Sequence, residues 1–101
     1  MYDPKKLGQQ VKAAREIRSK KSDLPFTQRN LAQKIGETSK WVKRLENGEF
    51  YPDWDTLALI ADTCGVDMAF LLGEEMEQEE YEEAIRGGRV ARTIPYAQLH
   101  I

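Results

Sequence analysis

Residues 27–48 read TQRNLAQKIGETSKWVKRLENG, and this pattern predicts two short helices joined by a glycine turn. Thr27 is a typical N-cap, because its hydroxyl can accept a hydrogen bond from a backbone N–H of the first turn. Leu31 and Ile35 lie four residues apart and therefore share one face of the first helix. Gly36 adopts positive φ without steric cost, so it ends this helix and turns the chain toward the next one.

The second predicted helix separates apolar from polar side chains. Thr38 is its expected N-cap, and Val42 and Leu45 lie three residues apart on the face that contacts the core. Polar side chains occupy the opposite face, namely Ser39, Lys40, Lys43 and Arg44. This arrangement is a helix-turn-helix, in which the second helix commonly enters the major groove of DNA.

The start of the first of these helices carries two further signals. Phe26 and Leu31 flank the Thr27 cap in the positions of a hydrophobic staple. Asn30 stands where a capping box has Glu or Gln. We therefore expect an incomplete box at an otherwise well-marked helix start.

The same stretch resembles the phage lambda and Cro repressor-like family of helix-turn-helix regulators. The family pattern, in order, is Thr-Gln, Leu-Ala, Gly, Ile or Val, Glu-x-Gly and Pro. This chain has those residue types at matching spacings, as Thr27-Gln28, Leu31-Ala32, Gly36, Val42, Glu46-Asn47-Gly48 and Pro52. The resemblance covers about residues 7–73 and implies an all-α, five-helix DNA-binding domain.

The resemblance also implies which side chains contact DNA. Gln28 begins the first helix and Asn47 ends the second, at the positions that contact phosphate in the family. Ser39, Lys40 and Arg44 fall at the base-reading positions, where arginine favours guanine. The full predicted DNA-contact set is Gln28, Thr38, Ser39, Lys40, Trp41, Lys43, Arg44 and Asn47.

Four residues have two interpretations each. Lys43 has the length to reach phosphate or base, and is otherwise a solvated lysine. Trp41 either covers the junction of the two helices or lies against sugar or a thymine methyl group, and we favour core cover because an exposed Trp is uncommon. Arg15 and Glu46 match an ion pair of the family that braces the recognition helix, and are otherwise two unconnected surface charges.

Three segments depart from the family pattern. The linker over residues 19–25 is longer than usual, and its two lysines, Lys20 and Lys21, either reach phosphate or are merely solvated. Two acids, Glu37 and Glu49, are expected to weaken affinity at the groove edge. Phe50 and Tyr51 follow Glu49. Either the hydroxyl of Tyr51 donates a hydrogen bond to phosphate, or both rings pack at a subunit contact.

The net charge of −2 argues against a nucleic-acid partner, but its distribution reverses that conclusion. Residues 1–50 carry twelve Lys or Arg against six Asp or Glu, whereas residues 51–101 carry three against eleven. The basic half contains the helix-turn-helix, which is the electrostatic pattern expected for phosphate contact.

Three more helices complete the expected domain over residues 1–73. A first helix over residues 4–18 carries Leu7, Val11 and Ala14 on one face. A fourth begins after an N-cap at Asp53 and ends at Gly65. A fifth, over residues 68–72, has its N-cap at Asp67 and stops before Gly73.

Residues 74–101 form an acidic C-terminal extension. Seven glutamates between residues 74 and 83 predict an exposed helix to about Arg86, with a weak apolar stripe that includes Tyr81. Residues 89–94 alternate like a short strand before Pro95. A lone strand is unstable, so this segment either pairs in a dimer, docks on a protein partner, or is disordered.

Composition excludes several classes. The longest apolar runs are five residues, far below the roughly 20 needed to cross a bilayer, so we expect a soluble, cytoplasmic protein without a membrane partner. Cys64 and His100 each occur once, which leaves a metal site or a nucleophile-base pair without further ligands or partners. We therefore expect no cofactor, no metal and no enzyme activity.

The leading hypothesis is a homodimeric transcriptional regulator of phage or prokaryotic type, most simply a repressor of an inverted-repeat operator in double-stranded DNA. Two recognition helices then lie about one DNA turn, ~34 Å, apart. One alternative is an antitoxin that represses its own operon and binds a toxin through residues 74–101. Another is a protein–protein adaptor that uses the same helices without DNA.

Overall fold

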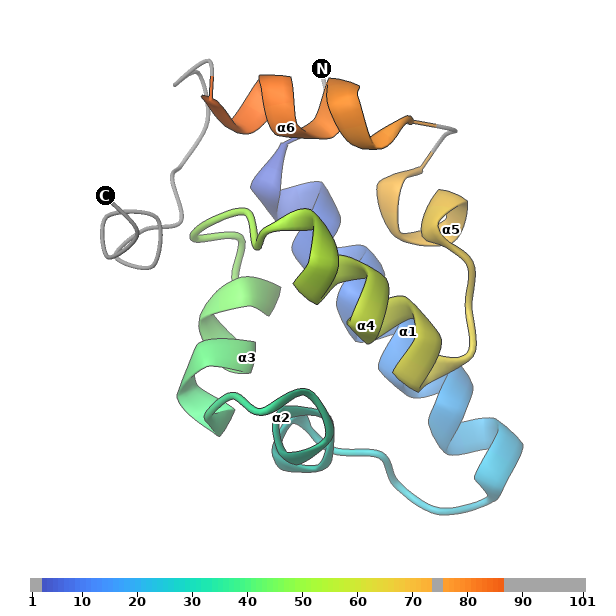
Figure 1. Cartoon of the computed structure of the whole chain (residues 1–101). Helices are drawn as coiled ribbons and strands as arrows, with labels where there is room; N and C mark the ends of the chain where they lie inside the picture. The colour runs from blue at the N-terminus through green and yellow to red at the C-terminus, as the bar shows by residue number, and fades with distance from the viewer. Residues whose placement is uncertain (1–2, 74–75, 87–101) are drawn as a thin grey trace.

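The described part of the chain is all-α (Figure 1). This computed structural model describes residues 3–73 and 76–86, which contain six helices and no strand. The helices are α1 Pro4–Ser22, α2 Gln28–Ile35, α3 Ser39–Glu46, α4 Trp54–Cys64, α5 Met68–Leu72 and α6 Gln78–Arg86. The predicted all-α class is confirmed for these residues, whereas the predicted strand over residues 89–94 lies outside them. No helix in the described ranges has the length and apolarity to span a membrane.

Aspartate and threonine side chains determine where five helices begin. Asp3, Thr27, Thr38, Asp53 and Asp67 each adopt an extended conformation and accept a hydrogen bond from the backbone N–H of the third residue of the following helix. An N-cap of this kind contributes about 1 kcal/mol to stability. The caps predicted for α2, α3, α4 and α5 are therefore confirmed.

The prediction of an incomplete capping box at α2 is wrong. The Asn30 side-chain oxygen accepts a hydrogen bond from the Thr27 N–H at 3.0 Å, while the Thr27 hydroxyl accepts one from the Asn30 N–H at 3.1 Å. Asparagine has the same carbonyl acceptor as glutamine on a shorter stem. The shorter stem suffices here, so both halves of the box are present.

Helix α1 ends at Ser22, beyond the expected end at Arg18. The hydroxyl groups of Ser19 and Ser22 donate to backbone carbonyls one turn earlier, at 3.1 and 3.0 Å, so both serines fit within the helix. Asp23 then ends it in a left-handed conformation, with φ of 60°. Most of the predicted linker over residues 19–25 is therefore helix.

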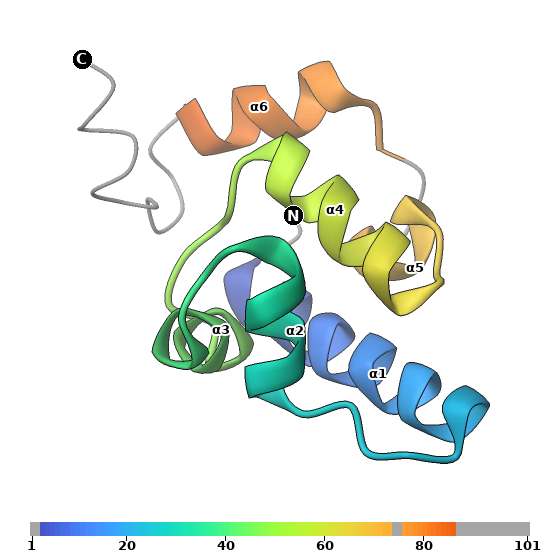
Figure 2. The ribbon, with the colours of Figure 1, turned by 60° about the horizontal axis from the view of Figure 1, so that its bottom comes forward.

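The extension places two lysines far from α3. Lys20 and Lys21 occupy the last turn of α1, where cations interact favourably with the helix dipole. The ammonium group of Lys21 lies beside Gly65, at the C-terminus of α4. This end of α1 lies across the molecule from α3 in both views (Figures 1 and 2). This position does not favour the interpretation in which the two lysines reach phosphate beside α3.

The hydrophobic core lies where α1 packs against α3, α4 and α5, and where α2 packs against α3 and α4. The predicted α1 stripe of Leu7, Val11 and Ala14 is fully buried. Burying a large aliphatic side chain contributes about 1.5–3 kcal/mol. The side chains that pack with this stripe include Leu31, Ile35, Val42, Leu45, Leu57, Ile60, Leu71 and Leu72.

Helices α1 and α3 are in close backbone contact at Gly8. A Cβ atom added to Gly8 would lie 2.5 Å from the carbonyl oxygen of Glu46 and 2.6 Å from that of Leu45. Both obstacles are backbone atoms, which cannot rotate away. The α1 surface at residue 8 therefore has to be bare for α3 to pack in its observed position.

Helix α6 packs on the connection between α3 and α4 through Tyr81. The phenol donates a hydrogen bond to the carbonyl of Pro52 at 2.7 Å, and the ring makes edge contacts with Tyr51 and Trp54. Tyr81 is buried, so α6 is not the wholly exposed helix expected from its acidic sequence. The proposed division of the chain after residue 73 stays a prediction.

We predict that Gly8→Ala lowers the free energy of unfolding by about 1–3 kcal/mol, because overpacking outweighs the helix preference of alanine. Urea unfolding followed by circular dichroism measures this loss. The matched control is Gln9→Ala, at the adjacent exposed position, which should change stability by less than about 0.5 kcal/mol. A Gly8→Ala protein as stable as the wild type would contradict the close approach.

Candidate nucleic-acid interface

Helix α3 presents one face to the core and the other to solvent. Val42 and Leu45 are fully buried, which fixes the rotation of the helix about its axis. Four polar side chains consequently face outward, namely those of Ser39, Lys40, Lys43 and Arg44. The predicted division of α3 into a core face and a polar face is confirmed.

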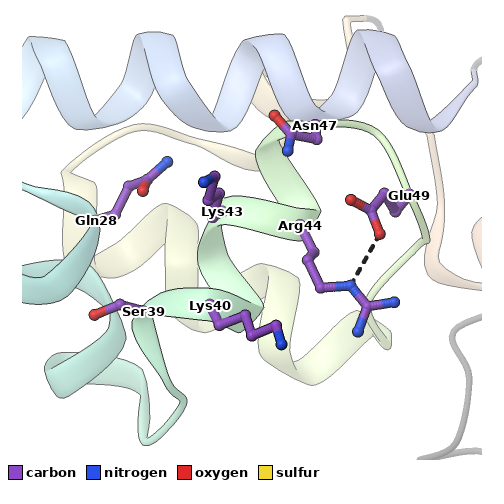
Figure 3. A pocket seen from close by; sticks show the side chains of 7 residues that line it. All are labelled: Gln28, Ser39, Lys40, Lys43, Arg44, Asn47 and Glu49. Carbon is purple, nitrogen blue, oxygen red and sulfur yellow. Dashed lines mark hydrogen bonds and ion pairs between the residues drawn. The ribbon is translucent and has the colours of Figure 1, made fainter.

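Side chains from α2, α3 and the turn after α3 surround a hollow of about 560 Å³ (Figure 3). We call it the α2–α3 hollow. Its lining residues are Gln28, Ser39, Lys40, Lys43, Arg44, Asn47 and Glu49. Six of these seven belong to the predicted DNA-contact set. They come from α2, α3 and the end of α3, and the apolar periodicity of the sequence does not by itself predict that they meet. The structure brings the six together on one open surface.

The other two members of the predicted set take part in the fold. The hydroxyl of Thr38 accepts a hydrogen bond from the Trp41 N–H at 3.0 Å, which is the N-cap of α3. The Trp41 ring is half-buried and meets the Phe50 ring edge-on, with 5.2 Å between centroids. Of the two interpretations of Trp41, this contact favours core cover.

A buried carboxylate joins the three helices around the hollow. Glu46 of α3 accepts hydrogen bonds from Arg15 of α1, at 2.6 Å from Nε and 2.9 Å from Nη2, and from the Gln28 amide at 3.0 Å. Arg15 also donates to the carbonyl of Phe26, just before α2, at 3.0 Å. The Glu46 side chain is 4% exposed and that of Arg15 is 13% exposed. The predicted ion pair is therefore formed, and it extends to Gln28.

The hydrogen bonds in this network affect the charge of Arg15 and the orientation of the Gln28 amide. The hydrogen bond to Glu46 raises the pKa of Arg15 above its ordinary value, so the guanidinium keeps its charge at neutral pH. An amide nitrogen carries two N–H groups. Glu46 accepts from one of those of Gln28, and the same amide lines the hollow, so Gln28 has a second donor for an anion.

The charge of the hollow is positive. Lys40, Lys43 and Arg44 contribute three cations, and Glu49 contributes one carboxylate. The N-terminus of α2 is also at this surface, and its backbone N–H groups and dipole favour a negatively charged ligand. A surface of this kind attracts the phosphates of nucleic acid.

The sequence predicts Glu49 only as an acid that weakens affinity, whereas the structure also places it in contact with Arg44. Its carboxylate accepts a hydrogen bond from Arg44 Nε at 2.9 Å, as the dashed line in Figure 3 marks. Both side chains are exposed, at 57% for Arg44 and 43% for Glu49. The sequence signal for this contact is Gly48, which follows the end of α3 and stands between the opposite charges of Arg44 and Glu49, five residues apart.

Neither role suggested for Phe50 and Tyr51 fits their positions. Both are buried within the chain, at 6% and 2% exposure, so they are not surface groups for phosphate or a second subunit. Burial raises the pKa of Tyr51 to about 12 and that of Cys64 to about 11. The two rings are buried because Trp41 packs against Phe50 and Tyr81 packs against Tyr51, contacts that the local sequence does not indicate.

Two other features of the described residues bear on the candidate site. Glu37, the second predicted acid, lies in the turn between α2 and α3, where burial and then the charge of Asp53 raise its pKa. No group of three or more metal-binding side chains occurs in the described ranges. None of the protein-family models, curated proteins or solved structures compared with the chain matches it.

We predict that Glu46→Gln lowers the free energy of unfolding by about 3–5 kcal/mol, because it leaves the Arg15 charge buried without a counter-charge. Chemical denaturation at neutral pH measures this. Glu49→Gln serves as the comparison, since it alters an exposed pair and should cost less than about 1 kcal/mol. Equal, small losses for the two variants would show that the buried network does not hold the helices together.

Proposed function

We propose that this protein is a sequence-specific regulator of transcription that binds double-stranded DNA as a helix-turn-helix protein of the lambda and Cro repressor-like type. The observation that carries the proposal is the α2–α3 hollow, in which six polar side chains from two helices line one positively charged surface. Such a surface matches the phosphates and base edges of a duplex better than it matches a small apolar ligand.

The dimensions of α3 suit a major groove. Its eight residues span about 12 Å at 1.5 Å per residue, and a helix with side chains is about 10–12 Å wide. The major groove of B-DNA is about 12 Å wide. In the proposed complex α3 lies in this groove, and its polar face meets three or four base pairs.

The proposed contacts divide into positioning and reading. Gln28 and Asn47 flank the polar face of α3 in the hollow and would bind phosphates on either side of the groove. Ser39, Lys40 and Arg44 would read base edges, with Arg44 forming two hydrogen bonds to guanine. Lys43 shares the hollow with both groups and would contribute to affinity for any sequence.

A single α3 contacts too few base pairs for useful selectivity, so we propose that two copies bind an inverted repeat. Two-fold symmetry would place the recognition helices about one DNA turn, ~34 Å, apart. A dimer seated over a promoter would repress by excluding the polymerase. Affinity would fall as salt concentration rises, because lysine and arginine release counterions from phosphate.

The test is selection of duplexes from a random library, followed by titration of the selected duplex with stoichiometry measured in the same sample. We expect an inverted repeat bound by two chains. Lys40→Ala together with Arg44→Ala should weaken this binding by about tenfold or more and erase part of the base preference.

The matched control for that titration is Lys20→Ala, which removes one positive charge at the far end of α1. We expect its affinity to stay within about twofold of the wild-type value, because Lys20 is in the last turn of α1, across the molecule from α3. The proposal fails if the wild-type protein enriches no sequence, or if the double variant binds every duplex as the wild type does.

A further inference from the structure

The turn after α3 has a defined hydrogen-bond geometry. Gly48 adopts a left-handed conformation, with φ of 80°, and its N–H donates to the carbonyl of Leu45 at 3.0 Å. The N–H of Glu49 donates to the carbonyl of Arg44 at 3.1 Å. These two bonds, from the residues after Asn47 back to the last turn, constitute a Schellman motif.

The Schellman motif places Glu49 directly over Arg44. Side chains at these two positions of the motif commonly make a hydrophobic contact. Here the contact is an ion pair, with 2.9 Å between Arg44 Nε and Glu49 Oε1. The backbone that carries Glu49 is itself fixed, because a Cβ atom on Gly48 would lie 2.6 Å from Lys5 Cγ and 2.7 Å from Lys5 Cα of α1.

This contact uses one particular edge of the guanidinium group. Glu49 accepts from Nε, so this hydrogen bond does not use the two terminal nitrogens of Arg44. Figure 3 shows these two nitrogens on the side of the guanidinium group opposite its own helix. Two parallel N–H groups are what guanine requires, since it offers O6 and N7 as paired acceptors in the major groove.

We infer that Glu49 is a specificity-determining residue: it holds the Arg44 guanidinium so that its terminal nitrogens read one guanine in each half-site. This inference depends on the proposed DNA-binding function and assigns a role to a residue that the family resemblance left out. Glu49 acts through Arg44 and is therefore a positioning residue.

The carboxylate has two opposite effects on binding. It repels phosphate, which lowers affinity for every duplex. It also removes rotational freedom from a long side chain before binding, which lowers the entropic cost of forming two directional hydrogen bonds. Once DNA covers the pair and excludes water, their mutual attraction increases. Glu49 thus exchanges general affinity for preference between bases.

Two substitutions separate these effects. Glu49→Ala removes both the charge and the acceptor. Glu49→Gln removes the charge but retains an amide oxygen that can accept from Arg44 Nε. The control for net charge is Glu79→Ala, on the exposed acidic face of α6, which removes one carboxylate without altering the hollow.

The probes are the duplex selected by the wild-type protein and copies in which single guanines are replaced by 7-deazaguanine, which lacks the N7 acceptor. The guanine read by Arg44 is the one whose replacement by 7-deazaguanine weakens binding by the wild type but does not weaken binding by Arg44→Ala. The discrimination ratio at this position is the affinity for the selected duplex divided by the affinity for its 7-deazaguanine copy. We expect a ratio of about tenfold for the wild type, a ratio within about threefold of that value for Glu49→Gln, and the loss of most of the discrimination for Glu49→Ala.

We also expect Glu49→Ala to bind an unrelated duplex more tightly than the wild type does, whereas Glu79→Ala should leave the discrimination ratio unchanged. The inference is overturned if Glu49→Ala gains affinity for all duplexes and keeps the full preference for guanine. In that case selective DNA binding by the wild type still stands. A wild type that selects no duplex overturns both the proposed function and this inference. Matching circular dichroism spectra establish that the variants are folded.

Discussion

The arrangement of the candidate site depends on the buried carboxylate of Glu46. This group lies at the end of α3 and accepts hydrogen bonds from α1 through Arg15 and from the start of α2 through Gln28. A buried charge is costly unless it is paired and hydrogen-bonded, so the three helices are stable together only in the geometry that satisfies it. Within the described residues, every buried side-chain nitrogen and oxygen has a partner.

The position of α3 follows from this constraint together with two glycines. Gly8 lets the backbone of α3 approach α1, and Gly48 turns the chain against Lys5 at the other edge. Because Val42 and Leu45 are buried at the same time, they determine which face of α3 meets the core. Its cations consequently remain on one exposed surface. Strong internal attachment and an exposed positive face are the two properties that reading a duplex requires.

The sequence predicted the helices that have clear boundary signals, and it missed contacts between segments distant in sequence. Asp53 and Gly65 mark both ends of α4, because capping is a local interaction. The end of α1 was placed too early, since nothing local distinguishes serines that bond back into a helix from serines in a loop. Tyr81 appeared to belong to a weak apolar stripe, and only the fold brings Pro52 to its hydroxyl. The prediction that Gln28 lies beside α3 came from the family resemblance, whereas the Arg44–Glu49 contact could be recognised only from the geometry of the turn after α3.

We propose that the α2–α3 hollow is the surface that binds DNA. The most direct measurement is a titration of isotope-labelled protein with its selected duplex, followed residue by residue by nuclear magnetic resonance. We predict the largest chemical-shift changes at Gln28, the polar face of α3 and Asn47, with small changes at the C-terminal end of α1 and on the exposed face of α6. Changes concentrated on α6 or the end of α1, with α3 unaffected, would contradict it.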